Sequence, residues 1–142
     1  SSDVCSSDLE TYNRDILVFG QGYIVCRDTE EEAISYRDKY VRENGDWEGV
    51  RNLLDTLVPN SESALGDGWE SMAANLIAGY GAIPLVGTPD QVVDAMMKYY
   101  DVGITSFLFY GFDHGRDQDV FGRTVIPLLR KRVAERDARA AE

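Results

Sequence analysis

The chain has 142 residues, of which 44% are hydrophobic, and its formal net charge at pH 7 is -11. This length and apolar content are sufficient for one domain with a hydrophobic core. The acidic balance argues against binding to nucleic acid or to an anionic membrane, because their phosphates would be repelled. No apolar run reaches membrane-spanning length, nothing resembles a cleavable signal and the two cysteines lack metal-ligand spacing, so we expect a cytoplasmic protein that holds no metal.

Residues 1–9 have no periodicity and resemble the translated sequencing-adapter read-through found at the ends of some metagenomic gene sequences. We therefore expect this segment, including Cys5, to be non-native. The expected domain covers residues 10–137, and a short tail follows at 138–142. On this interpretation the gene extends upstream, and the chain is the carboxyl-terminal fragment of a longer protein.

The first predicted unit is a strand followed by a helix. Residues 16–26 form an apolar, strand-like run, and a capping box from Thr29 to Glu32 opens a helix that continues to about Glu43. The acidic first turn of this helix suits the positive end of the helix dipole.

A long insertion separates the first unit from the second. Residues 46–82 exceed a plain connection in a compact α/β domain. Helical spacing of apolar residues on either side of the polar run 59–63 predicts two short helices around a mobile turn. An insertion that enters at the carboxyl end of a strand is a lid candidate, and an extra packing layer outside the sheet is an equally good interpretation.

The second unit has the clearest local signals. A short strand ending at Val86 leads into a helix that Thr88 can cap, with Pro89 at its first position and Gln91 completing a capping box. Gly103 ends this helix, because glycine adopts the left-handed conformation at little cost.

The third unit closes the chain. Residues 104–110 are apolar at almost every position, which predicts a strand covered on both faces. A final helix is predicted from about Asp117 to Asp137, and Pro127 should kink it or end its first segment. Strands alternating with helices are typical of a parallel α/β sheet. Three units cannot close a barrel of eight strands, so we predict the last three β-α units of a TIM (β/α)8 barrel, with a helical insertion.

An ordered series of motifs then indicates a family. The series resembles the carboxyl-terminal region of the bacterial luciferase-like flavin monooxygenases, and within them the alkanesulfonate, dimethyl sulfone and pyrimidine monooxygenase branch. The resemblance covers roughly residues 16–132, and its motifs lie at 75–81, 84–93, 102–104, 121–122 and 125–129.

The resemblance implies a TIM barrel that uses reduced FMN and molecular oxygen to oxygenate a small organic substrate. It also implies a separate flavin reductase that delivers the FMN, a homo-oligomeric full-length protein, and no metal. The cofactor performs the oxidation, while the protein binds, orients and excludes water. Two alternatives remain: an oxidoreductase of the same superfamily that uses deazaflavin F420, and a non-catalytic flavin-binding or structural homologue.

Site residues are carried over from the resemblance position by position. Gln21 and Tyr23 stand where the sulfonate branch has an Arg and a His that face the pocket, so a neutral substrate fits better than an anionic sulfonate. At the last strand Tyr110 opens a segment in which Phe112 replaces the pocket tyrosine of the family and His114 keeps its histidine.

The resemblance thus gives His114 as a catalytic candidate, because its charge can change near neutral pH, and Gln21, Tyr23, Tyr110 and Phe112 as cofactor-binding candidates. Each has a simpler explanation. A lone loop histidine is more often a solvated or capping residue, and the aromatic side chains can be ordinary core. Gln21 and Tyr23 share a strand face, which suits a pocket or an internal polar pair.

Overall fold

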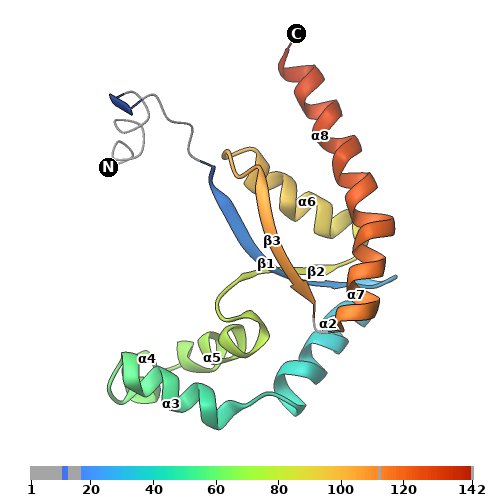
Figure 1. Ribbon diagram of the computed structural model, residues 1–142. Coiled ribbons are helices and arrows are strands. Elements are labelled where there is room, and N and C mark those ends of the chain that lie inside the picture. Colours follow the sequence, from blue (N-terminus) through green and yellow to red (C-terminus); the bar gives the residue numbers. More distant parts are fainter. Residues whose placement is uncertain (1–10, 13–16, 112, 142) are drawn as a thin grey trace.

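A computed structural model describes residues 11–12, 17–111 and 113–141, and its fold is shown in Figure 1. The expectations for residues 1–9 and for Phe112 lie outside these described residues. Three parallel strands form one sheet in the order β2-β1-β3. Their bounds are Phe19–Cys26 for β1, Ile83–Gly87 for β2 and Ser106–Gly111 for β3.

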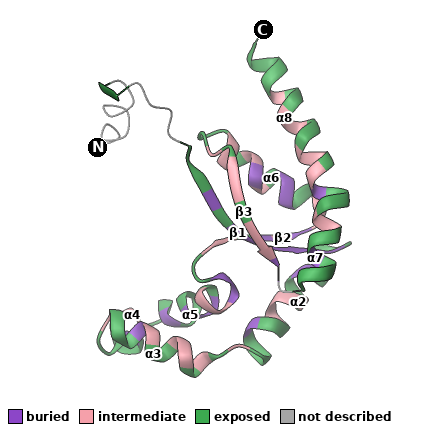
Figure 2. Cartoon of the chain, viewed as in Figure 1, coloured by how far each residue is buried: buried purple, intermediate pink, exposed green. Residues whose placement is uncertain are grey.

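The strand β1 occupies the centre of the sheet. In its carboxyl-terminal half every residue from Gly22 to Cys26 is buried, whereas Phe19 and Gln21 are exposed (Figure 2). Within the described part of the chain β3 pairs only with β1, and Leu108 in it is 57% exposed. The prediction that this last strand is covered on both faces is correct only in part: Phe107 and Phe109 pack against one helical layer and Tyr110 against the other, whereas Leu108 is left exposed.

Helices cover both faces of the sheet (Figure 1). One face carries α2 (Glu30–Asp38), the π-helical turn η1 (Lys39–Glu43) and α5 (Gly68–Gly79), which pack around Tyr23 and Val25. The other face carries α6 (Pro89–Tyr100), the π-helical turn η2 (Phe121–Val125) and α8 (Ile126–Ala140), which pack around Ile24 and Cys26. Crossovers that run first to one edge of a sheet and then back past the centre must lie on opposite faces if both are right-handed.

The predicted α/β class, parallel strands and helical insertion are confirmed, and the three strand-helix units are consistent with part of a TIM barrel. The strand order differs from that of a barrel arc, where consecutive strands are neighbours. Here β2 and β3 lie on either side of β1 instead of pairing with each other. The physical reason is that β1 is the longest strand, with apolar side chains on both faces, and gains most from a central position.

The predicted ends of the second helix are confirmed. The Thr88 side chain accepts a hydrogen bond from the Gln91 backbone, and the Gln91 side chain accepts one from the Thr88 backbone. Pro89 is the first residue of α6, and Gly103 has a φ of +94° just beyond it.

The final helix is interrupted, as Pro127 predicted. It consists of α7 (His114–Val120), then η2, then α8, with Pro127 as the second residue of α8. A proline has no N–H to bond the preceding turn, so a helix readily breaks there. α7 begins before the predicted residue, Asp117, because the Asp113 carboxylate caps the N–H groups of Gly115 and Arg116.

The insertion contains three helices instead of the predicted two: α3 (Trp47–Leu57), α4 (Ser61–Leu65) and α5. The polar turn contains α4 because Asp55 accepts hydrogen bonds from both the backbone N–H and the hydroxyl of Ser61, at 2.9 and 2.8 Å. The indole of Trp69 in turn donates to the Ser61 hydroxyl at 3.1 Å. A small core of Leu54, Trp69 and Ala73 completes this unit.

Acid should loosen this insertion. The two hydrogen bonds from Ser61 hold the pKa of the Asp55 carboxyl below its ordinary value of 3.8. A pKa lowered by folding stabilises the fold above the unfolded-state pKa, and this stabilisation is lost as the pH falls through the folded-state pKa. We expect the Trp69 fluorescence to change below about pH 4. In the Asp55→Asn variant the fluorescence change at low pH should be smaller. An identical change in the variant would show that protonation of Asp55 is not its cause.

Candidate functional site

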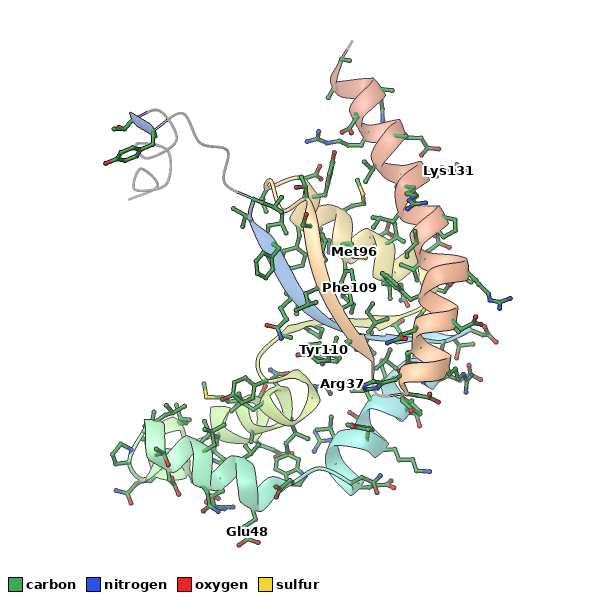
Figure 3. All side chains as sticks on the ribbon, viewed as in Figure 1. Arg37, Glu48, Met96, Phe109, Tyr110 and Lys131 are labelled. Atoms are coloured by element: carbon green, nitrogen blue, oxygen red, sulfur yellow. The ribbon has the colours of Figure 1, made fainter. Side chains whose placement is uncertain are left out.

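The polar residues predicted for the site gather on one face of the sheet. The strand register places Tyr23 beside Tyr110, and Gln21 lies two positions earlier on the same face of β1. In Figure 3, Tyr110 points from β3 toward α5, whereas Phe109 points to the opposite side, toward Met96 of α6. The structure therefore brings together three of the five predicted residues.

The Tyr110 hydroxyl links the sheet to the insertion. It donates a hydrogen bond to the carbonyl oxygen of Gly79, the last residue of α5, and it also bonds to the Gln21 side chain. Burial raises the pKa of Tyr110 above its ordinary value of 10.0, and the hydrogen bond from Gln21 offsets only part of that rise. Tyr110 is therefore a neutral phenol at physiological pH, able to donate one hydrogen bond and accept another.

Tyr23 is fully buried beneath α5. The Nε of Arg37 donates to the Tyr23 hydroxyl at 3.0 Å, and the same guanidinium reaches Asp38 at 3.2 Å and Asn75 at 3.3 Å. A Cβ built on Gly79 would lie 2.5 Å from the ring of Tyr23, so the helix backbone rests directly on that ring. Nothing can reach the Tyr23 ring unless α5 moves.

These positions fit a flavin only in part. Gln21 is exposed and Tyr110 is half-buried, so an amide and the edge of a phenol ring are available to a bound ring system. Tyr23 is not available, because α5 covers it, and its part is to support Tyr110 and α5. His114 is the first residue of α7 and is exposed, outside the hydrogen-bonded set.

Two charged residues that were not predicted to belong to the site lie near the carboxyl edge of the sheet. Arg27 follows β1 directly, and its backbone N–H donates to the Gly87 carbonyl at the end of β2, at 3.1 Å. Its guanidinium contacts Asp117 of α7 at 2.7 Å, and the two side chains are only 4% and 1% exposed. A charged residue immediately after a buried strand was the available signal, because parallel sheets bind ligands at that edge.

Among the described residues, no group of three or more His, Cys, Asp or Glu side chains is placed to hold a metal ion. Within residues 11–12, 17–111 and 113–141, no helix combines the length and apolar character needed to cross a bilayer.

Comparison of the chain with protein families identifies its class. The sequence model of the family described as luciferase-like monooxygenase matches residues 7–106. That match covers more than half of the chain, and the chain belongs to this family. The resemblance inferred from the sequence motifs is thereby confirmed.

Two individual proteins are similar to the chain over most of its length. The chain is 31% identical to a sulfoquinovose monooxygenase of Novosphingobium aromaticivorans, over 82% of this chain and 36% of that protein. It is 29% identical to an FMNH2-dependent dimethylsulfone monooxygenase of Pseudomonas putida, over 84% of this chain and 34% of that protein. The chain thus spans about a third of the length of these relatives.

A solved structure shares the fold. The crystal structure of a riboflavin lyase with modified FMN and riboflavin aligns with a TM-score of 0.56 and 18% identity, covering 89% of this chain and 34% of that one. At this identity the similarity establishes the fold alone.

Proposed function

We propose that the chain is the carboxyl-terminal part of a longer, FMNH2-dependent, two-component monooxygenase that oxygenates a small organic substrate such as an organosulfur compound. The observation that carries the proposal is the family match over residues 7–106. The printed activities of two relatives, on sulfoquinovose and dimethylsulfone, support organosulfur compounds as the substrate class. Sulfoquinovose carries an anionic sulfonate and dimethyl sulfone is neutral, so only the second relative supports a neutral substrate. A separate flavin reductase, a cytoplasmic location and a homo-oligomeric assembly are part of the same proposal.

The described residues have defined roles in it. Gln21 and Tyr110 contact the cofactor by hydrogen bonding, while the buried Tyr23 fixes the position of Tyr110. His114 donates or accepts a proton at the carboxyl edge of the sheet. Phe112, which lies outside the described residues, stays a cofactor-binding candidate from the family resemblance alone. Reduced FMN supplies the electrons that activate oxygen.

The insertion is proposed to act as a lid over this site. α5 contacts Tyr23 and Tyr110 through Gly79, and a helix in this place excludes water from the sheet face. Opening would separate α5 from the sheet and also break its contacts with α2 and η1, such as the hydrogen bonds from Arg37 to Asn75 and from Arg42 to Glu70. The small core of the insertion could move with it, because that core is formed largely by α3 and α5 themselves.

A neutral substrate is proposed because the site offers no free cation at Gln21 or Tyr23. The nearest positive charge from α2, on Arg37, is already engaged by Tyr23, Asp38 and Asn75. An anionic sulfonate would lack a dedicated partner at these positions, whereas a neutral sulfone oxygen needs only a hydrogen-bond donor such as Gln21 or Tyr110.

The decisive experiment uses the longer protein recovered from the upstream coding sequence. With reduced FMN supplied by a flavin reductase, we expect oxygen uptake coupled to oxygenation of dimethyl sulfone or a related neutral compound. Hydride transfer to F420 in place of oxygen uptake would instead assign an F420-dependent oxidoreductase. Absence of both activities, with flavin binding retained or lost, would favour a non-catalytic homologue and overturn the proposal.

A further inference from the structure

A buried ion pair joins the carboxyl end of β1 to α7, the helix that follows β3. The Nη1 of Arg27 donates to the Asp117 carboxylate at 2.7 Å and to the carbonyl of Cys26 at 2.8 Å, and the guanidinium stacks on the ring of Tyr36 at 4.1 Å. With its backbone bond to Gly87, Arg27 contacts β1, β2, α2 and α7 at once. It therefore links the elements that meet at the carboxyl edge of the sheet.

This ion pair is expected to contribute little to the free energy of folding. Burying two charges costs desolvation energy that their attraction only partly repays, and an apolar pair of similar volume is often as stable. Nη2 of Arg27 is also buried without a hydrogen-bond partner among the described residues, which adds a further cost. Because burying the Arg27–Asp117 pair costs free energy, its presence is better explained by the positions in which it holds the neighbouring residues.

The imposed geometry concerns the turn that carries His114. The second oxygen of Asp117 accepts a hydrogen bond from the backbone N–H of Asp113 at 2.9 Å. The Asp113 carboxylate caps α7 by accepting from the N–H groups of Gly115 and Arg116, each at 3.1 Å. Asp117 is thus hydrogen-bonded to Asp113 through both its side chain and its backbone N–H, which closes the turn from residue 113 to residue 117. The other carboxylate oxygen of Asp117 accepts the hydrogen bond from Arg27.

The close approach of Gly111 shows how tightly this turn is held. A Cβ at Gly111 would lie 2.5 Å from the Cβ of Asp117, so the end of β3 is in direct contact with the first turn of α7. His114, the first residue of α7, lies in the sequence between Gly111 and Asp117.

We propose that Arg27 is a positioning residue which, through the Asp117 carboxylate, fixes the turn bearing His114 at the carboxyl edge of the sheet. The inference rests on the proposed function in one respect, since His114 is the catalytic residue of that proposal. Arg27 itself acts through Asp117 and needs no contact with substrate.

The test is native-state amide hydrogen exchange on the chain and three variants. Asp117→Asn weakens the charged hydrogen bonds, and Arg27→Lys keeps the charge but loses the planar fork and the stacking on Tyr36. Asp119→Asn is the matched control, because Asp119 lies on the same helix but forms an exposed pair with Arg123.

We expect Asp117→Asn to accelerate exchange about tenfold at the amide of Asp113, since weakening a hydrogen bond to a charged group typically changes an equilibrium by that factor. The amides of Gly115 and Arg116 donate to the Asp113 carboxylate, and their exchange should accelerate as the turn that holds Asp113 loosens. Amides in the middle of α6 should change by no more than about twofold, and Arg27→Lys should give a smaller acceleration at the same three amides. The control should leave all of them unchanged.

Equal acceleration throughout the chain, or none in the turn, would overturn the proposal, because the pair would then serve global stability only. If Asp117→Asn does not fold, the result for Arg27→Lys decides in the same way. The sole histidine of the chain gives a second readout, because its ring resonances should broaden or shift in the two variants and not in the control. Neither measurement needs flavin, so failure of the proposed function would be recognised separately, by the absence of oxygen uptake.

Discussion

The Tyr23→Ala variant is expected to lose about 3–5 kcal/mol of unfolding free energy, the range for truncating a large aromatic side chain in a core. Tyr23 is fully buried on the central strand, where α2 and α5 converge with Tyr110. Removing its ring leaves a cavity that the surrounding helices and sheet can only partly fill, and it also leaves Arg37 without one of its acceptors. Urea denaturation followed by circular dichroism measures this loss.

Tyr23→Phe is the matched control for this prediction. It keeps the ring and removes only the hydroxyl that accepts from Arg37, so the expected loss is about 1 kcal/mol. Because Arg37 also contacts Asp38 and Asn75, it is not left without partners. Equal losses in the two variants would show that the hydrogen bond, and not the packing of the ring, carries the contribution of Tyr23.

The second large effect is expected from a single added methyl group. Gly79→Ala should destabilise the chain by about 1–3 kcal/mol, the usual cost of overpacking. The new Cβ would lie 2.5 Å from the ring of Tyr23 and 3.1 Å from the hydroxyl of Tyr110. Neither ring can yield easily, because Tyr23 is fully buried and Tyr110 is bonded to the backbone of Gly79 itself. The loss should appear in the urea midpoint.

Gly68→Ala is the control at the other end of the same helix. A Cβ at Gly68 meets nothing within 4 Å, and alanine has a higher helix propensity than glycine. This variant should be neutral or more stable by up to about 1 kcal/mol. If both glycine variants behave alike, α5 is not docked on Tyr23 as described, and the proposed lid contact is wrong. If only Gly79→Ala is destabilised, the contact between the insertion and the sheet is established.

Local features of this protein were predictable from the sequence because their causes lie within a few residues. The capping box of Thr88 and Gln91, the glycine at 103 and the break at Pro127 each depend on neighbours along the chain. Alternating strand and helix patterns likewise indicated a parallel α/β sheet, and the ordered motifs indicated the family. At the site, the spacing of Gln21 and Tyr23 placed them on one face, and the register then placed Tyr110 beside them.

Only the tertiary structure decided how these elements meet. Burial by helices from both sides put β1 at the centre of the sheet and left β3 at its edge, a choice that no short segment contains. The same packing covered Tyr23 with α5. Tyr23 was predicted to contact the cofactor, but in the structure it packs against its neighbours instead. Arg27 and Asp117 are 90 positions apart, and no local pattern pairs them. Such contacts depend on the balance of burial and desolvation over the whole sheet, and that balance is set when distant segments pack together.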